Sequence, residues 1–236
     1  MGADHCQAIA ETRRKLQRLG IQRVLFLDET HLRVNEAART TLVAPGEQPY
    51  VVVEDTTQYA KRFDMIACCT SEEVLPPIIF SPSERQQMGV KGINKQMLLD
   101  YISDILARAC SGLDRYPLYL VMDRARIHNV AHILEAFHEA GCQEMKEIIL
   151  LPKQAAKRMS PLDNSLFHIW KDACRKHEHI TERTITRIMA DEWNSIPKRT
   201  ITAYYKHCKI TGRSNVFADC PAPTEHNHPA PRFRVR

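Results

Sequence analysis

Two short apolar segments of this chain each end on an acidic residue, and they constrain its fold more than any other feature. Residues 24–27 (VLFL) run into Asp28, and residues 118–122 (LYLVM) run into Asp123. Segments this short and this apolar are typical of strands buried on both faces of a parallel sheet. We therefore expect an α/β fold in which both acids stand at the carboxyl ends of buried strands.

Two kinds of apolar segment alternate along the chain. Strands are predicted where the apolar runs are short, at 23–29, 62–70, 74–80, 117–123 and 147–152. Helices are predicted where apolar residues recur every three or four positions, at 5–19, 94–110, 126–141, 160–177, 182–196 and 198–208. The segment 74–80 contains two prolines, which place it at a sheet edge. The order predicts a mixed five-stranded sheet flanked by helices, with extra C-terminal helices.

The composition divides the chain into four parts. We expect an N-terminal linker helix over 1–20, the sheet domain over 21–180 and a helical extension over 181–212. The tail 213–236 is rich in proline and poor in apolar residues, so we expect it to be disordered. A Pro-Gly turn and an apolar run mark 43–53. The linker helix is expected to carry a basic face formed by Arg13, Arg14, Lys15 and Arg18.

A third acid completes the pattern, because Asp163 begins a helix about ten residues after the apolar strand 148–151. Site residues of open α/β sheets cluster at the carboxyl ends of strands, so we expect Asp28, Asp123 and Asp163 to converge. Converging carboxylates repel one another, and hard divalent cations such as Mg²⁺ relieve that repulsion. Two ions roughly 3.5–4 Å apart can activate water and stabilise the leaving oxygen of a phosphodiester. Taken alone, each acid is more typical of a turn or a helix cap.

The charge of the chain is unevenly distributed. The net charge is +5, but residues 1–152 sum to −3 and residues 153–236 sum to +8. A basic C-terminal third favours nucleic acid as the partner, and a solvated basic surface is the alternative. The sequence contains no membrane-length apolar run and no secretory signal. The eight cysteines are scattered, so we expect reduced thiols in a cytosolic or nuclear protein.

Three segments resemble the catalytic blocks of DDE/DDD-superfamily transposases, and the mariner-type and pogo-type branches match best. The segments are FLDETHLRV (26–34), LVMDRARIHNVAHILEAF (120–137) and IILLPKQAAKRMSPLDNSLFHIWK (148–171). They contain Asp28 in a first block, Asp123 with His128 in a second, and Leu-Pro followed by Asp163 in a third. The 39 residues between Asp123 and Asp163 lie within the range of mariner-like relatives, and the resemblance covers roughly residues 20–210.

This resemblance implies an RNase H-like fold and a metal-dependent DNA endonuclease or strand transferase. It implies that Asp28, Asp123 and Asp163 are the catalytic metal ligands for Mg²⁺ or Mn²⁺, with two ions expected. Such enzymes cut DNA at transposon ends and join the 3′ ends to a target. DNA is the implied partner, the nucleus the implied location, and a homodimer is compatible with it. Two alternatives stay open: a non-catalytic DNA-binding protein derived from a transposase, and an RNase H-like nuclease acting on RNA or hybrids.

The chain departs from the family pattern at three points. Many relatives have the third acid at the position of Phe167, whereas the pogo-like register Pro-Leu-Asp places it at Asp163, which we adopt. Arg124 stands where Asn usually follows the second acid, and it either pairs with Asp123 or contacts DNA. About 20 residues precede the first strand, too few for a DNA-reading domain. We therefore expect a catalytic fragment, a degenerate copy or a host-adopted descendant.

Basic residues around the predicted acids are candidates for contacts with nucleic acid. They are Arg124, His128, Lys153, Lys157 and Arg158. His128 either hydrogen-bonds a metal ligand, contacts the scissile phosphate or only begins a helix, and the loop lysines either contact phosphates or are solvated. Glu29 neighbours Asp28, but strand alternation points it to the other face, so we expect a supporting role at most.

Overall fold

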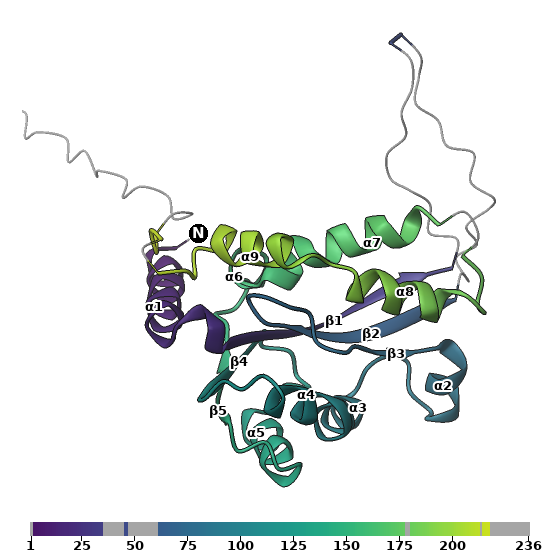
Figure 1. Ribbon diagram of the computed structural model, residues 1–236, viewed down its shortest axis with the longest axis horizontal. Coiled ribbons are helices and arrows are strands. Elements are labelled where there is room, and N and C mark those ends of the chain that lie inside the picture. The colour runs from purple at the N-terminus through teal and green to yellow at the C-terminus, as the bar shows by residue number, and fades with distance from the viewer. Residues whose placement is uncertain (1, 35–44, 47–60, 178–179, 213, 218–236) are drawn as a thin grey trace, which may run out of the picture.

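The computed structural model describes residues 2–34, 45–46, 61–177, 180–212 and 214–217. Its centre is an open five-stranded sheet with the strands in the order β3-β2-β1-β4-β5 (Figure 1). The strands are β1 (Val24–Arg33), β2 (Arg62–Cys69), β3 (Ile78–Phe80), β4 (Leu118–Met122) and β5 (Met145–Leu150). β2 runs antiparallel to β1 and β3, whereas β4 runs parallel to both β1 and β5. The predicted mixed five-stranded sheet is therefore confirmed. The predicted end of the first strand at Asp28 is wrong, because β1 keeps pairing with β2 as far as Arg33, and only its pairing with β4 stops before Asp28.

β3 lies at one edge of the sheet, where the two prolines of the segment 74–80 placed it. The strand is shorter than predicted, because Pro76 and Pro77 have no N–H groups to donate to a ladder. Val74 forms only an isolated bridge to Cys69, and regular pairing with β2 begins at Ile78.

Helices cover both faces of the sheet (Figure 1). One layer contains α7 (Phe167–Arg175), α8 (Ile185–Asn194) and α9 (Lys198–His207), and the other contains α3 (Lys95–Tyr101), α4 (Ala107–Ser111) and α5 (Val130–Glu139). The remaining helices are α1 (Ala3–Leu19), α2 (Pro82–Gln87) and α6 (Ala156–Met159). Phe26 and Val121 pack with the α7–α9 layer, whereas Leu25 and Leu120 pack with the α3–α5 layer. This alternation decides which face a residue beyond each strand takes.

Two predicted helices differ from the observed ones in detail. The segment 94–110 is helical but contains a π-helical turn at Ile102–Leu106. α5 begins at Val130 rather than at residue 126, because the Asn129 side chain accepts the His132 N–H and caps the helix there. The predicted apolar run after the Pro-Gly turn and the predicted tail from residue 218 onward lie outside the described residues.

The prediction of a basic face on α1 is wrong at Arg13, which is buried. Its Nε donates to the Cys208 carbonyl at 3.2 Å, and its two Nη atoms donate to the carbonyls of Val216 and Arg158 at 3.0 and 3.3 Å. Burial of a guanidinium is tolerated where its donors find acceptors. Arg13 therefore ties α1 to the C-terminal segment and to the helix that precedes Asp163.

The described helices include none that is long and apolar enough to cross a bilayer. Seven cysteines fall within the described part of the chain, and all of them are buried and form no disulfide there. These cysteines act as small apolar residues of the core.

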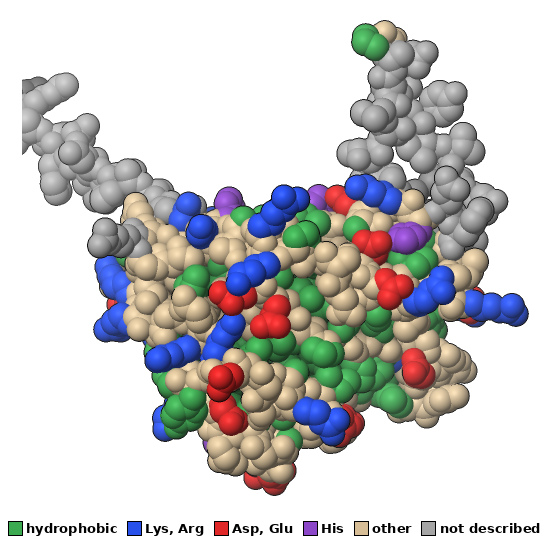
Figure 2. Space-filling model, viewed as in Figure 1, with side chains coloured by type: hydrophobic (Ala, Val, Ile, Leu, Met, Phe, Trp, Pro, Cys, Tyr) green, Lys and Arg blue, Asp and Glu red, His purple; other side chains and the backbone are tan. Residues whose placement is uncertain are grey.

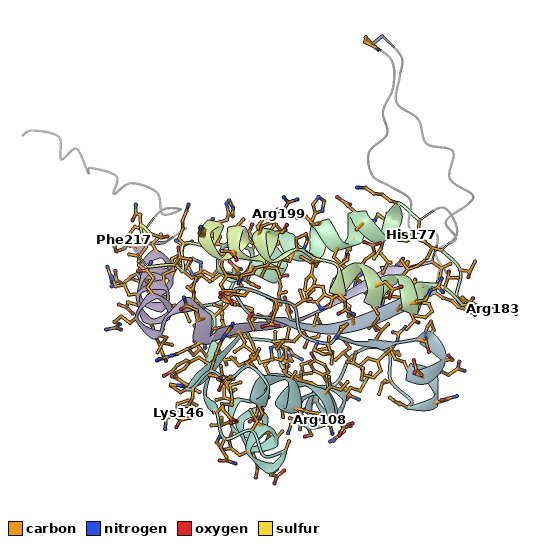
Figure 3. All side chains as sticks on the ribbon, in the orientation of Figure 1. Arg108, Lys146, His177, Arg183, Arg199 and Phe217 are labelled. Carbon is orange, nitrogen blue, oxygen red and sulfur yellow. The ribbon has the colours of Figure 1, made fainter. Side chains whose placement is uncertain are left out.

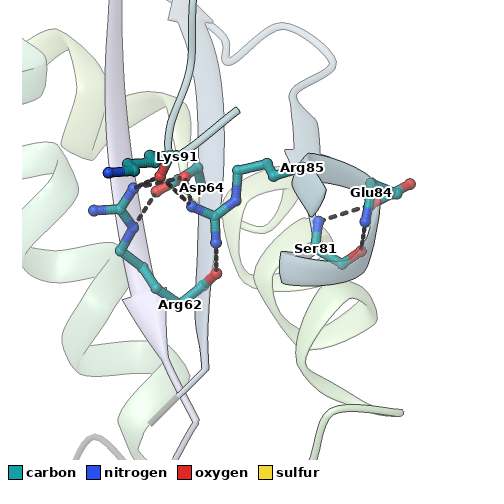
Figure 4. Close-up of polar contacts among 6 residues, drawn as sticks. All are labelled: Arg62, Asp64, Ser81, Glu84, Arg85 and Lys91. Carbon is teal, nitrogen blue, oxygen red and sulfur yellow. Dashed lines mark hydrogen bonds and ion pairs between the residues drawn. The ribbon is translucent and has the colours of Figure 1, made fainter. Parts of the chain in front are cut away.

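A buried ion-pair cluster fixes α2 against β2 (Figure 4). The carboxylate of Asp64 is buried and lies 2.9 Å from Arg62 Nε and 2.8 Å from Arg85 Nη1. Arg85 is also buried and donates to the Arg62 carbonyl. Ser81 and Glu84 form a capping box that starts α2. The cap and the ion pairs together hold the outer edge of the sheet.

Replacing Asp64 with Asn should lower the free energy of unfolding by about 3 kcal/mol, because Arg85 is then buried without a counter-charge. Glu182→Gln is the control, since it breaks an exposed ion pair with Lys61 and should cost less than about 1 kcal/mol. Urea unfolding followed by circular dichroism measures both changes. Equal losses in the two variants would contradict this role for Asp64.

Candidate active site

Parallel pairing between β1 and β4 brings two of the predicted acids together. Phe26 pairs with Val121, and Asp28 and Asp123 each follow two residues beyond that pair. Because side chains alternate along a strand, both acids take the face of Phe26 and Val121, which is covered by the α7–α9 layer. The two carboxylates therefore stand at one level on adjacent strands.

Asp163 reaches the same place from the π-helical turn Leu162–Leu166, which leads into α7. The Ser160 hydroxyl accepts the Asp163 N–H at 3.4 Å, and both end residues of the turn are buried in the core. The turn is thus fixed so that the Asp163 carboxylate is hydrogen-bonded to Asp28 and lies within electrostatic range of Asp123. The structure brings the three predicted acids into one cluster.

The proximity of these acids shifts two pKa values upward. Burial is the largest cause for Asp28, whose pKa lies well above its usual value, and the charges of Asp163, Glu29 and Asp123 add to it. The pKa of Asp163 is also raised, first by burial and further by the charge of Asp123. Its hydrogen bond to Asp28 and the charge of Lys157 oppose that rise. Asp28 and Asp163 therefore hold protons more strongly than isolated carboxylates do.

His128 connects the acids of the two strands and is fully buried at its side chain. Its Nδ1 donates to Asp123 Oδ1 at 2.9 Å, and its Nε2 donates to Glu29 Oε1 at 2.9 Å. Burial disfavours the imidazolium, but the two carboxylates outweigh burial and raise the pKa of His128 to about 10. The hydrogen bond from His128 is in turn the main cause that lowers the pKa of Asp123. With both ring nitrogens engaged, His128 contacts a candidate metal ligand and has no free nitrogen for a phosphate.

The donor chemistry of the cluster fits a hard divalent cation. Asp28 and Asp163 offer carboxylate oxygens, and a cation between them would stabilise the ionised carboxylates that burial disfavours. Asp123 uses Oδ1 for His128 and for the Ala125 N–H, while its Oδ2 has no partner among the described residues. In the described ranges no three His, Cys, Asp or Glu side chains form a complete cage. Asp28 and Asp163 are therefore the central ligands of the candidate metal site, and Asp123 lies at its edge.

The segment before Asp163 carries three of the predicted basic residues, and it is partly helical rather than a loop, because Lys157 and Arg158 lie in α6. Lys157 is exposed, and its charge acts on the Asp163 carboxylate. Lys153 is exposed and Arg158 is half-buried, and both border an open hollow of about 570 Å³ together with His5 of α1. The structure thus places Lys157 within electrostatic range of Asp163, whereas Lys153 and Arg158 lie at a hollow beside the N-terminal end of α1.

Arg124 does not form the predicted ion pair with Asp123 within the described residues, and its contact with DNA stays a prediction. Its Nε donates to the Leu151 carbonyl at 2.9 Å, rather than to the carboxylate of Asp123. The residue is exposed overall. Arg124 thus fastens the ends of β4 and β5 to each other beside the acids, and its charge remains at the surface.

Glu29 takes the supporting position on the other face that strand alternation predicted, but its partner His128 was not predicted. Glu29 follows Leu27 on the α3–α5 face of β1, opposite to Asp28, and from there it holds His128. The only indication of this role in the sequence was that Glu29 directly follows Asp28 after the apolar run 24–27. The partner lies 99 residues further along the chain, so only the fold reveals the contact.

The sheet order, the two helical layers and the acids on adjacent strands define an RNase H-like domain. The chain belongs to the DDE superfamily endonuclease family, whose family model matches residues 23–186. The predicted kinship with DDE-superfamily transposases is confirmed by this match and by the solved structures of one such transposase. No curated protein sequence matches the chain significantly.

Solved structures of the Mos1 mariner transposase share this fold. Its paired-end complex with Mn superposes with a TM-score of 0.66 at 14% identity, over 93% of this chain and 62% of that chain. Its isolated catalytic domain superposes with a TM-score of 0.59 at 11% identity, over 89% of this chain and 90% of that chain. The complex with the left transposon end is matched over 60% of its own length. At these identities the likeness establishes the fold.

The two hydrogen bonds from His128 to Asp123 and Glu29, called here the His128 clamp, predict how the free energy of unfolding depends on pH. The folded-state pKa of about 10 exceeds the reference value of 6.5, so the stabilisation is complete below pH 6.5 and is lost as the pH rises toward 10. Over that window the wild type should lose up to about 1.4 kcal/mol per pH unit relative to His128→Gln. Urea unfolding at several pH values measures the difference, and parallel profiles would contradict the clamp. In the wild type itself, NMR of the His128 ring should still show the imidazolium above pH 8.

Proposed function

We propose that this chain is a metal-dependent DNA endonuclease and strand transferase of the transposase type. The observation that carries the proposal is the convergence of Asp28, Asp123 and Asp163, with raised pKa values at Asp28 and Asp163. Membership of the DDE superfamily endonucleases supports the reaction class. The Mos1 complexes with transposon ends, with Mn and with Mg support DNA as substrate and a divalent ion as cofactor.

Each acid has a distinct part in the proposed site. Asp28 and Asp163 form its centre, and Asp123 offers Oδ2 from the neighbouring strand. Two Mg²⁺ or Mn²⁺ ions, when bound, would supply activation of water and neutralisation of charge at the phosphodiester. His128 and Glu29 keep Asp123 ionised and fixed in orientation. Residues that hydrogen-bond a metal ligand commonly have this role.

The surrounding cations would position the DNA. Lys157 lies beside Asp163, and Lys153 and Arg158 border the hollow at the N-terminal end of α1. Cations of this kind contact phosphates and set the register of the strand without reading its sequence. We further propose a nuclear location and assembly as a homodimer, since a transposase acts on two DNA ends.

One observation favours a second candidate, a non-catalytic DNA-binding protein that keeps the fold. The described residues contain no complete cage of three metal-binding side chains, and Asp123 is turned toward His128. In that case the buried acids would keep their protons, and the basic surface would still bind DNA. Metal binding separates the two candidates.

Calorimetric titration with Mn²⁺ tests the proposal. The wild type should bind Mn²⁺ and release protons, because the metal displaces protons held by Asp28 and Asp163, and the release should shrink as the pH is raised. Two buffers of different ionisation enthalpy measure the released protons. Asp28→Asn should abolish binding, whereas Asp104→Asn, an exposed acid in the other helical layer, should leave it unchanged. A folded wild type that binds no Mn²⁺ with or without duplex DNA would favour the non-catalytic candidate.

Glu29→Gln should weaken Mn²⁺ binding by roughly 10- to 100-fold, because His128 then loses a charged partner and Asp123 is held less firmly. Nicking of supercoiled plasmid in Mn²⁺ should fall with the loss of affinity and recover when the metal concentration is raised. An unchanged affinity in this variant would remove Glu29 from the site. Glu182→Gln, in the exposed turn before α8, provides the matched control.

A further inference from the structure

The outward face of α9 is basic and lies apart from the residues of the proposed metal site. Residues 198–210 contain no acid. Basic residues recur along the segment and are Lys198, Arg199, Lys206, His207 and Lys209. Figure 2 shows Lys and Arg side chains along the upper edge of the molecule, over the α7–α9 layer, and Figure 3 places Arg199 on the outer side of that layer.

The inner face of α9 is fixed to the sheet independently of these cations. Ile201 and Tyr205 are buried, and the Tyr205 hydroxyl contacts the carbonyls of Val24 and Cys69 at 3.1 and 3.0 Å. Thr202 donates its hydroxyl hydrogen to the Ser71 carbonyl at 2.8 Å. The fold therefore mounts α9 rigidly through its apolar side, and the outer cations are not needed for that mounting.

The outer face is hollowed between its cations. An open hollow of about 600 Å³ is lined by Lys198, Arg199, Thr202, Ala203 and Lys206. Lys198 pairs with Glu72 at 3.3 Å, whereas Arg199 and Lys206 have no ion-pair partner among the described residues. Seven residues separate Arg199 from Lys206, which is about 10 Å along a helix axis. Two unneutralised cations thus stand two helical turns apart, with the small side chain of Ala203 between them.

We propose that this face of α9 binds the phosphate backbone of duplex DNA, as a contact separate from the acid cluster. The proposal rests on the proposed function for its choice of polyanion. An extended array of cations in an open hollow fits a long polyanion, because a small anion needs donors that converge on one point. Duplex DNA presents one negative charge per about 1.7 Å of axis, so several phosphates lie within the span from Arg199 to Lys206. The contact should be independent of base sequence.

The test is the affinity of the full chain for a fluorescein-labelled duplex of arbitrary sequence, measured by anisotropy in EDTA. The double variant Arg199→Gln/Lys206→Gln should raise Kd on the order of 10-fold or more at moderate salt. It should also lower the slope of log K against log salt by about 2, since two phosphate contacts are lost. Arg199→Lys/Lys206→Arg keeps both charges and should restore the wild-type affinity.

A matched control removes the same charge elsewhere. Arg108 of α4 and Lys146 of β5 are exposed and lie far from α9 in Figure 3. Arg108→Gln/Lys146→Gln should leave the affinity within about 2-fold of the wild type. Equal losses in the two double variants would mean that only net charge matters, and no loss in the α9 variant would mean that the face is not used. Either result would overturn the proposal.

The same experiment separates duplex DNA from another acidic partner and from the metal site. Poly-glutamate should compete weakly, and competition as strong as that of unlabelled duplex would overturn the assignment to nucleic acid. The α9 double variant should bind Mn²⁺ as the wild type does, because none of its changes touches the acid cluster. If Asp28→Asn loses Mn²⁺ binding but keeps its affinity for DNA, the α9 contact does not depend on the metal site, as proposed.

Discussion

The parallel pairing of β1 with β4 is the contact on which the rest of the site depends. It sets Asp28 and Asp123 at one level on neighbouring strands, on the face covered by α7, α8 and α9. Burying a carboxylate and placing other acids close to it both cost free energy, and this cost appears as the raised pKa of Asp28. A positive charge lies on the opposite face of the same strands and offsets part of this cost. It is the imidazolium of His128, which Glu29 and the chain beyond β4 enclose.

Rigid supports surround this strained centre. Arg13 donates to the carbonyls of Cys208 and Val216 in the C-terminal segment and of Arg158 in the helix before Asp163. Arg124 joins the ends of β4 and β5, and Asp64 fixes the far edge of the sheet. Each support is buried or bonded to backbone, so it resists the repulsion of the acids without adding charge to their cluster. A metal ion would then complete a site whose frame is already in place.

Local patterns allowed much of this fold and site to be predicted. The apolar runs identified β1 and β4, although β1 continues past Asp28 to Arg33, and the prolines identified an edge strand. Contacts between distant residues could not be predicted, because no periodicity encodes them. Burial of Arg13 needs acceptors from the C-terminal segment, and the Glu29–His128 bond joins β1 to the connection between β4 and α5. The late start of α5 was missed because Asn129 was not recognised as its cap.

Anomalous diffraction from crystals soaked in Mn²⁺ tests the central claim most directly, since it locates the ion without any assumption about activity. The account predicts an anomalous peak bounded by carboxylate oxygens of Asp28 and Asp163 at about 2.0–2.2 Å, with Asp123 Oδ2 turned toward it and the bond from His128 retained. An ordered acid cluster with no anomalous peak, or a peak confined to other acids on the surface, would contradict it.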